Sequence, residues 1–592
     1  MKASSKDESK KVLVAIAWPY VNGDIHLGHI AGYLLPADMF ARYKRFCGDD
    51  VLMVSGSDCH GTPITVEADK TGIAPAEVIK KYHKHDVDLF KFYGLTYNLY
   101  TKTTTENHKQ VTQQMFMDLL KNGFISKDVM KQYFSPAENK FLPDRYVEGK
   151  CPHCGAEEQR SDQCESCGRW LGEGELINPY SKLTKSPVEL KETEHYFLNF
   201  DKLAGELKDY VATKKGIWRD WVFAEADGWL REGLQKRAIT RDLDWGVELP
   251  VKEISKLDKD KQLASYTNKR IYVWFEAVIG YLSAAVEWSQ ISSKGAPSSS
   301  SYDGIYSKYE GQSTDWRDWW LNPQSEHYYF MGQDNLVFHT LMWPGQLIGS
   351  NQGYTLPWNV VINRFMNYEG RKFSKSRNWI IDSGAIAEKY GVDTVRYAVG
   401  SNLPENKESD FTWKGFVEAT NNELVANLGN FINRTLKFFE TKMGGSIKGV
   451  EADLDEDVKD TIDMQFRESA SLFNKAKFVE GIQQIMNLSR FGNQYFDREE
   501  IWKTIKTDEA EAKKVMLNLL NIVSALNVLI APVTPTAAEK LSKMLPIGDG
   551  LLEPQVGVNK WKSTFRTEYK LQGPVTVLFT KLDMETVLRE KV

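Results

Sequence analysis

Six consecutive apolar residues, Val12–Ala17, constrain the fold more than any other feature of the sequence. A run without alternating polar residues is typical of a strand buried on both faces of a parallel sheet, and Trp18-Pro19-Tyr20 ends it at a turn. A stretch with helical spacing follows from His26 to Phe46, and a second apolar run, Val51–Val54, comes next. This alternation of strand, loop and helix predicts a doubly wound α/β core that binds a nucleotide.

The segment His26-Leu27-Gly28-His29 joins the first predicted strand to the helix. Two imidazoles three residues apart at a helix N-terminus point the same way, beside unpaired backbone N–H groups and the positive end of the helix dipole. Gly28 leaves room for a nucleotide that lies over the helix start. The segment therefore suits phosphate, although two surface histidines near a helix start would give the same pattern.

A second cationic segment lies far downstream, at Gly370-Arg-Lys372-Phe373-Ser374-Lys375-Ser376-Arg377. Its lysines and arginines, with two serines and a flanking glycine, suit a mobile loop that closes over a polyphosphate, whereas the alternative is a solvated basic turn. The order of the two segments along the chain favours the phosphate interpretation of both.

The two segments resemble the HIGH and KMSKS motifs of class I aminoacyl-tRNA synthetases, with Leu27 for Ile and Phe373 for Met. The resemblance implies that ATP binds here with Mg²⁺, and that positioned donors stabilise the transition state as an amino acid carboxylate attacks the α-phosphate. It implies catalytic roles for His26, His29, Lys372 and Lys375. Nucleotide contacts are implied for Gly28, Asp334, Ser374 and Ser376.

Three further strings are similar to those of the methionyl-tRNA synthetase family within this class: Ala17–Gly23, Tyr272–Tyr281 and Gly332–Pro344. The resemblance implies a thioether pocket with aromatic walls, against which sulfur packs well. Asp58 would receive the substrate ammonium, and Arg241 would pair with Asp58 or with the nucleotide. The other implied methionine-binding residues are Tyr20, Trp274, Tyr281, Phe338, His339 and Trp343. Any one of these aromatic residues alone could equally be a core residue.

Four cysteines are arranged as two CxxC pairs, Cys151 with Cys154 and Cys164 with Cys167. Two such knuckles predict one closed tetrahedral zinc site, which is structural because no position is left open for water. A redox dithiol is the weaker alternative.

Beyond Thr412 apolar residues recur at helical spacing, so we expect a helical region. Asn430 and Arg434 share a helix face, and Trp502 lies in a mostly polar segment. By resemblance they would read the anticodon, since stacking and polar edges recognise splayed bases. A solvated Asn/Arg face and a half-buried Trp are the alternative.

The formal net charge is −5, so any RNA contact depends on local basic patches. No apolar run reaches the length of a membrane span, and the polar start has no secretory signal, so we expect a cytoplasmic protein. The short tail lacks the length of an appended dimerising module, which favours a monomer.

The pattern along the chain predicts an α/β, Rossmann-like parallel-sheet catalytic domain in two halves, residues 1–123 and 251–345, around a zinc-bearing insertion at 124–250. A stem-contact region (346–411), an all-α anticodon-binding bundle (412–545) and a tail (546–592) follow. The implied partners are methionine and tRNA(Met), the initiator included. Alternatives are a synthetase for another apolar amino acid, a small-molecule adenylyltransferase of the HxGH type, or a non-catalytic RNA-binding protein on the same scaffold.

Overall fold

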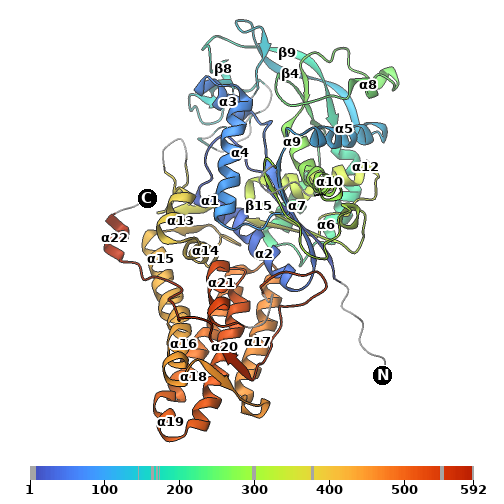
Figure 1. Cartoon of the computed structure of the whole chain (residues 1–592). Coiled ribbons are helices and arrows are strands. Elements are labelled where there is room, and N and C mark those ends of the chain that lie inside the picture. Colours follow the sequence, from blue (N-terminus) through green and yellow to red (C-terminus); the bar gives the residue numbers. More distant parts are fainter. Residues whose placement is uncertain are drawn as a thin grey trace, which may run out of the picture.

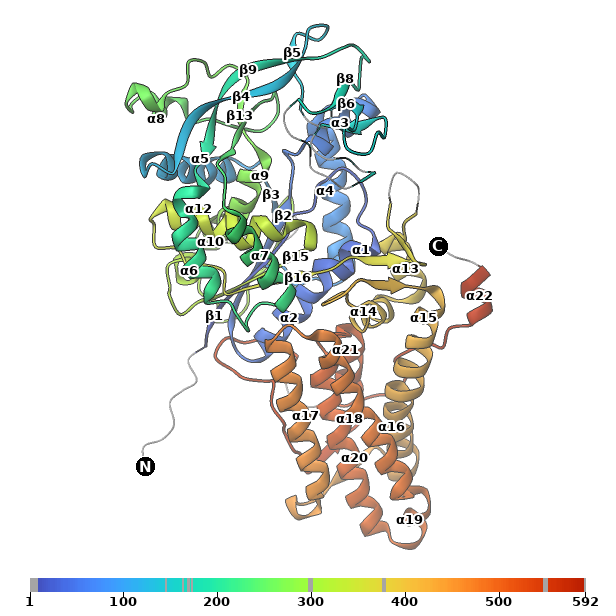
Figure 2. The same ribbon diagram turned by 180° about the vertical axis from the view of Figure 1, so that it is seen from behind.

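The computed structural model describes residues 9–143, 146–161, 164, 166–167, 171, 174–295, 302–374, 379–546 and 552–589. An α/β part that contains the main sheet lies at one end, and a bundle of long helices lies at the other (Figure 1). Seen from behind, the same two parts meet along α2, α14 and α21 (Figure 2).

The central sheet has the strand order β14-β3-β2-β1-β15-β16. All neighbouring pairs are parallel except β14 with β3. Along β1 the residues Val12, Val14 and Ile16 face one core, and Leu13 and Ala15 face the other. Burial on both faces explains why this run is continuously apolar. The strands are β1 (Lys11–Ile16), β2 (Asp50–Ser57), β3 (Leu99–Lys102), β14 (Ile305–Tyr306), β15 (Glu326–Gly332) and β16 (Asn359–Asn363).

Helices cover both faces of this sheet. On one face lie α2 (Leu35–Phe46) and α4 (Pro75–Phe92), and on the other α5 (Glu106–Lys121), α10 (Gly280–Ser293) and α12 (Trp343–Ser350). The predicted α/β class with a parallel, doubly covered sheet is confirmed.

An antiparallel pair dominates the segment between the two halves of the sheet. Strand β4 (Ile125–Ser135) pairs with β9 (Glu189–Leu198), and both extend away from the main sheet (Figure 1). Beside them a small sheet of β6 (Val147–Lys150), β7 (Gln159–Arg160) and β8 (Ile177–Ser181) carries the cysteine cluster.

The sequence Lys269–Glu276, whose β-branched and aromatic residues predict a single strand, divides into two elements. Strand β13 (Lys269–Ile271) ends before Tyr272, and α9 (Val273–Glu276) begins a helical turn. The prediction was wrong here because tertiary packing overrode strand propensity: the turn buries both Phe275 and Glu276. This turn matters for the site described below.

The expected helical region begins where Thr412 caps α15 (Trp413–Glu418), with its hydroxyl accepting from the N–H of Gly415. The long helices are α16 (Asn430–Met443), α17 (Glu456–Asn474), α18 (Phe478–Arg498), α20 (Glu509–Ile530) and α21 (Pro535–Met544), with the short α19 (Ile501–Thr507) at the far end (Figure 1). Within the described ranges α20 alone is long and apolar enough to cross a membrane, and 89% of its apolar window is buried. It is the central helix of this bundle.

The C-terminal segment returns along the molecule. Trp561 packs on Tyr43 of α2 and on Phe473 of α17, and β21 (Glu568–Lys570) pairs with β20 (Ser446–Lys448). The last described helix, α22 (Met584–Arg589), lies beside α15 (Figure 2). The tail thus contacts both parts of the protein.

A buried arginine joins the two parts. Arg396, on α14 (Val392–Gly400), pairs with Asp38 of α2 at 2.7 Å and donates to the carbonyls of Pro532 and Val533 at the end of α20, each at 2.9 Å. Arg396 and Asp38 are both fully buried. The helix that follows the first histidine motif is therefore tied directly to the bundle.

Candidate active site

The histidine motif lies where β1 gives way to a continuous helical stretch formed by α1 (Leu27–His29), a π-helical turn (Ile30–Leu34) and α2. The rings of His26 and His29 are 3.9 Å apart between centroids. Nδ1 of His26 accepts from the N–H of Gly28 at 3.1 Å, and Nδ1 of His29 accepts from the N–H of His26 at 3.1 Å. Each neutral ring then carries its proton on Nε2, which makes the outer nitrogen the donor that a phosphate oxygen requires.

The backbone N–H groups at this helix start are already used. Leu27 donates to the carbonyl of Ile381 at 3.2 Å, Gly28 to the His26 ring, and His29 to the carbonyl of His26. The expectation that unpaired amides would serve phosphate here is wrong, because the His26 side chain itself caps the helix. Donors for a phosphate at this point must come from the imidazoles.

The lysine segment begins beside this motif. Phe373 stacks on the His26 ring at 5.0 Å with an interplanar angle of 5°. After the loop, Trp379 pairs with Ser374 through two backbone hydrogen bonds of 2.9 Å, and Asp382 forms a bridge with His26. The two motifs, some 350 residues apart in sequence, therefore lie in contact.

Only part of the second motif lies within the described residues. Lys372 is exposed on β18 (Arg371–Lys372), and Ser374 lies two residues further on. Lys375 and Ser376 lie outside the described residues. Gly28 is needed for this contact, since a Cβ there would lie 3.0 Å from the His26 ring and 3.2 Å from Phe373.

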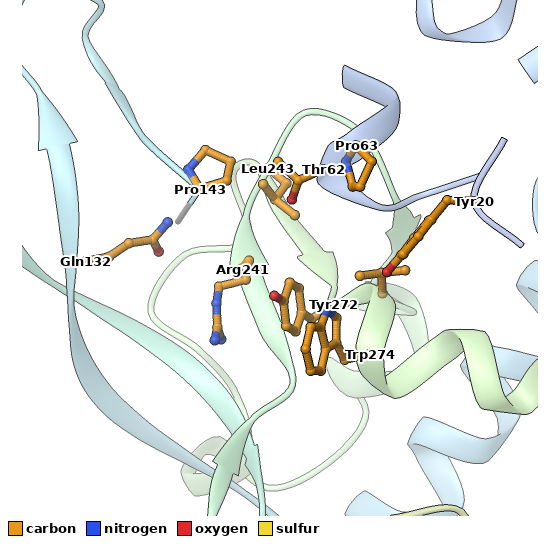
Figure 3. A pocket seen from close by; sticks show the side chains of 10 residues that line it. Tyr20, Thr62, Pro63, Gln132, Pro143, Arg241, Leu243, Tyr272 and Trp274 are labelled. Carbon is orange, nitrogen blue, oxygen red and sulfur yellow. The ribbon is translucent and has the colours of Figure 1, made fainter. Parts of the chain in front are cut away.

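A pocket opens between the insertion and the segments that follow the carboxyl ends of β1 and β2. It holds about 510 Å³ of space, part of it open to solvent. Among the predicted methionine-binding residues Tyr20, Arg241 and Trp274 line it (Figure 3). Gln132 and Pro143 of the insertion close it on the side opposite Tyr20 (Figure 3).

Deeper aromatic residues pack behind Trp274. Phe338 meets Trp274 edge to face at 4.5 Å. Nε2 of His339 accepts from the Tyr281 hydroxyl at 2.7 Å, while its Nδ1 donates to the carbonyl of Asn335 at 2.9 Å. Burial lowers the pKa of His339 to about 4, so the ring is neutral and its tautomer is fixed by these two bonds. Trp343 is fully buried and donates to the Tyr329 hydroxyl at 2.9 Å.

Asp58 follows β2 and is only 4% exposed. Its N–H donates to the Pro19 carbonyl and its own carbonyl accepts from Val21, which places it next to Tyr20. Burial raises the pKa of Asp58 well above its usual value, and the nearby Glu276 carboxylate raises it further. A buried carboxylate of this kind favours a cationic ligand.

The expected pair between Arg241 and Asp58 is not formed. The Arg241 guanidinium lies 4.5 Å over the Tyr272 ring and donates to the carbonyl of Thr240 at 3.0 Å. It is Asp242 that is buried in an ion pair, with Lys269 at 2.7 Å and with His195 at 3.1 Å. Arg241 therefore lines the pocket beside Tyr272, whereas Asp334 is exposed near the start of the Gly332–Pro344 string.

Three polar residues of the site were missed from the sequence, although one of them, Glu276, stands in a string quoted above. His60 and Glu276 are hydrogen-bonded to each other at 3.1 Å, and His108 contacts the other oxygen of Glu276. A charged residue in an otherwise apolar string, Glu276 in Tyr272–Tyr281, was the available signal.

The four cysteines converge as expected. All four sulfurs lie within 4.8 Å of one another, with Cys154 and Cys164 3.6 Å apart and Cys151 and Cys167 4.0 Å apart. A tetrahedron of thiolates at about 2.3 Å from zinc has edges of about 3.8 Å, so the set fits this metal. Cys151 and Cys164 are buried in a small core of their own with Val147.

At the far end of the bundle the predicted anticodon residues gather. The Arg434 guanidinium lies 4.3 Å over Phe496, and the Trp502 ring stacks on the same Phe496 at 5.8 Å. Arg434 also pairs with Asp497 at 2.8 Å. Asn430 is exposed one turn before Arg434, and Trp502 is 37% exposed. The three residues lie on one accessible surface near α19.

The parallel sheet, the two motifs in contact and the helical bundle together define a class I aminoacyl-tRNA synthetase. Residues 12–436 match the family model described as tRNA synthetases class I (M), and residues 443–589 match the anticodon binding domain of methionyl tRNA ligase.

Comparison with individual proteins agrees. The methionine–tRNA ligase of Roseiflexus sp. (strain RS-1) is 41% identical over 92% of this chain and 88% of its own length. That of Dehalococcoides mccartyi is 41% identical over 98% of this chain and 99% of its own. A solved Mycobacterium tuberculosis methionyl-tRNA synthetase in complex with methionyl-adenylate shares the fold, with a TM-score of 0.73 over 97% of this chain and 99% of its own at 22% identity. The chain belongs to the methionine–tRNA ligase family.

Proposed function

We propose that this protein is a methionine–tRNA ligase, which activates methionine with ATP to methionyl-adenylate and transfers the methionyl group to tRNA(Met), initiator tRNA included. The contact between the two motifs carries this proposal. Phe373, which directly follows Lys372, stacks on His26, and this contact supports a single site in which imidazoles and lysines act on one triphosphate.

In the first half-reaction the methionine carboxylate attacks the α-phosphate of ATP, and pyrophosphate leaves. His26 and His29 donate from Nε2 to phosphate oxygens, and Lys372 and Lys375 stabilise the charge that develops on the leaving pyrophosphate. Gly28, Ser374, Ser376 and Asp334 contact the nucleotide. Bound Mg²⁺ supplies charge neutralisation at the triphosphate.

Methionine binds with its ammonium group at Asp58 and its thioether among Tyr20, Trp274 and Phe338. Tyr281 and His339 fix the back wall, with Trp343 behind them, and Arg241 acts from the pocket rim. Because the His339 ring is neutral and fully bonded, it presents no charge to the apolar side chain of the substrate.

In the second half-reaction a terminal ribose hydroxyl of the tRNA attacks the methionyl carbonyl of the adenylate, so that an ester forms and AMP leaves. Trp502 stacks on an anticodon base and Asn430 and Arg434 bond to base edges. To bond to a base, the Arg434 guanidinium must release the Asp497 carboxylate with which it is paired. Cys151, Cys154, Cys164 and Cys167 hold one structural Zn²⁺ that keeps the insertion folded near the acceptor end.

Several coarser features belong to the same proposal. We assign the catalytic halves to residues 1–123 and 251–345, the insertion to 124–250, the stem-contact region to 346–411, the bundle to 412–545 and the tail to 546–592. The protein acts as a cytoplasmic monomer.

Pyrophosphate exchange tests the activity. Exchange into ATP should depend on methionine among the standard amino acids. Exchange driven by leucine would point to a synthetase for another apolar amino acid, and no exchange with any amino acid would exclude a synthetase.

A further inference from the structure

The carboxylate of Glu276 is buried near Asp58, the proposed ammonium site, and has no role in the reaction proposed above. Glu276, on the helical turn α9, is fully buried. Its Oε1 accepts from Nδ1 of His60 at 3.1 Å, and its Oε2 accepts from Nε2 of His108. Since burying an unpaired carboxylate is costly, both imidazoles are needed to keep it there.

His60 connects this carboxylate to Asp58. Its backbone N–H points to Oδ1 of Asp58 at 3.4 Å, while its ring bonds to Glu276. The main chain between them is held at Cys59, whose N–H donates to Thr103 at 3.0 Å and whose carbonyl accepts from the Trp245 indole at 2.7 Å. Asp58 is thus the end of a rigid turn that is anchored through His60.

The hydrogen bonds also define the role of His108, the second imidazole that contacts Glu276. The Ser283 hydroxyl donates to the carbonyl of Gly280 at 3.0 Å, so its oxygen accepts from Nδ1 of His108 at 2.9 Å. His108 therefore donates from both ring nitrogens and pairs as a cation with Glu276. Burial would raise the pKa of Glu276, but His60 and His108 outweigh burial and lower it to about 2, so it stays ionised.

We infer that Glu276 is a positioning residue of the amino-acid subsite: through His60 it holds the Asp58 carboxylate where the substrate ammonium must arrive. This inference rests on the proposed function. The other titratable groups that face Asp58 are Cys59 and Tyr281, and burial raises the pKa of each, so they are uncharged at neutral pH. Asp58 and the Glu276 group behind it therefore determine recognition of the amine.

The test compares three ligands by calorimetry, which needs no turnover: methionine, methioninol, and the deamino analogue that keeps the thioether and carboxylate. In Glu276→Gln the two imidazoles face a neutral amide, which offers one acceptor oxygen and one NH2 group in place of two carboxylate oxygens. We expect Kd for methionine and methioninol to rise about tenfold or more, and Kd for the deamino analogue to change less than about twofold. In exchange assays KM for methionine should rise with little change in kcat.

Glu287→Gln is the matched control. Glu287 is another inward-facing carboxylate of the same part of the protein, but it bonds to the hydroxyls of Thr101 and Tyr302 and to neither His60 nor His108. It should leave all three affinities unchanged. Equal weakening of all three ligands in Glu276→Gln would show a merely structural role and overturn the inference, and so would the same amine-selective loss in the control.

A second pair of variants covers the case in which Glu276→Gln does not fold. His60→Ala removes the ring and should show the same amine-selective loss. His60→Asn places an amide N–H near the position of Nδ1 and should restore most of the affinity; an unrestored affinity would contradict the role of the His60–Glu276 bond. If the wild-type protein binds none of the three ligands, the proposed function fails, which is a separate result.

Discussion

The two ends of this molecule build their proposed sites in opposite ways. At the catalytic end the recognition side chains are buried and bonded to one another: Tyr281 and His339 are each 2% exposed and hydrogen-bonded together. At the bundle end Trp502 is 37% exposed and Asn430 projects to the surface. A small ligand is recognised by a preformed wall, whereas an RNA base must be captured by accessible side chains.

The difference extends to composition. All ten histidines precede residue 340, so the bundle contains none. The histidines, the side chains whose ordinary pKa lies nearest to neutral, therefore all lie outside the bundle. Arg396, paired with the buried Asp38, connects these two differently built parts through its bonds to the carbonyls of Pro532 and Val533.

The largest loss of stability should come from removing the contacts that Arg396 makes. Arg396→Met leaves the buried Asp38 with the cation of Arg42, which lies 2.9 Å away, and with the two donors of Thr96, and it removes three bonds to backbone carbonyls. Burial would raise the pKa of Asp38, but Arg42 and Arg396 outweigh it and lower that pKa. We expect a loss of about 3 to 5 kcal/mol in unfolding free energy, measured by urea denaturation.

Arg490→Met is the control for Arg396→Met. Arg490 pairs with Glu423 at 2.6 Å, but both side chains are partly exposed, so the loss should stay below about 1 kcal/mol. Equal losses in the two variants would mean that the buried pair does not join the parts.

The next largest effect concerns chemistry at one end only. His29→Ala removes an Nε2 donor from the phosphate site, and we expect exchange to slow by about a hundredfold to a thousandfold, or about 3 kcal/mol. Affinity for tRNA should not change. His85→Ala, at a partly exposed histidine of α4 whose ring lies near Asp24 and Asp86, provides the control, and a His29→Ala enzyme with wild-type exchange would remove the motif from the mechanism.

Acid should destabilise the α/β part more than the bundle. Burial lowers the pKa of His339 and of His327 from 6.5 to about 4. The unfolded chain therefore binds more protons between pH 6.5 and pH 4, and stability falls as pH falls through that window, by about 3 kcal/mol for each histidine.

The measurement is thermal unfolding followed by a probe in each part. Melting of the α/β part should drop between pH 6.5 and pH 4 while that of the bundle changes less. His327→Gln, which can keep the donor to the Trp319 carbonyl, should make the pH dependence shallower. An unchanged slope would show that His327 is not neutral in the folded protein.

How far the sequence predicts these features depends on how local their causes are. The buried run Val12–Ala17 and the CxxC spacing can each be recognised from a short stretch of sequence alone. The structure confirms the strand predicted from the first and the cluster of four cysteines predicted from the second. The Glu276–His60–His108 group could not be inferred, because its members are brought together by three separate elements. The Arg241–Asp58 pair was expected from resemblance, yet the side-chain direction of Arg241 depends on packing against Tyr272.

The smallest effect tests the exposed end. Trp502→Ala removes a stacking surface at the tip of the bundle, and we expect tRNA charging to weaken by about 1 to 3 kcal/mol in kcat/KM while methionine-dependent exchange is unchanged. Trp229→Ala, at a similarly exposed tryptophan of α7 (Asp220–Glu232) in the insertion, is the control for loss of an exposed ring. Because Trp502 rests on Phe496, and Arg434 lies over the same ring, part of the loss could come from a displaced Arg434. Trp502→Phe, which keeps an aromatic ring over Phe496, separates the two causes: it should recover most of the charging if stacking is the contribution of Trp502. A Trp502→Ala enzyme that slows exchange as much as charging would mean that the ends are not independent, and the contrast between a preformed pocket and an accessible RNA surface would be lost.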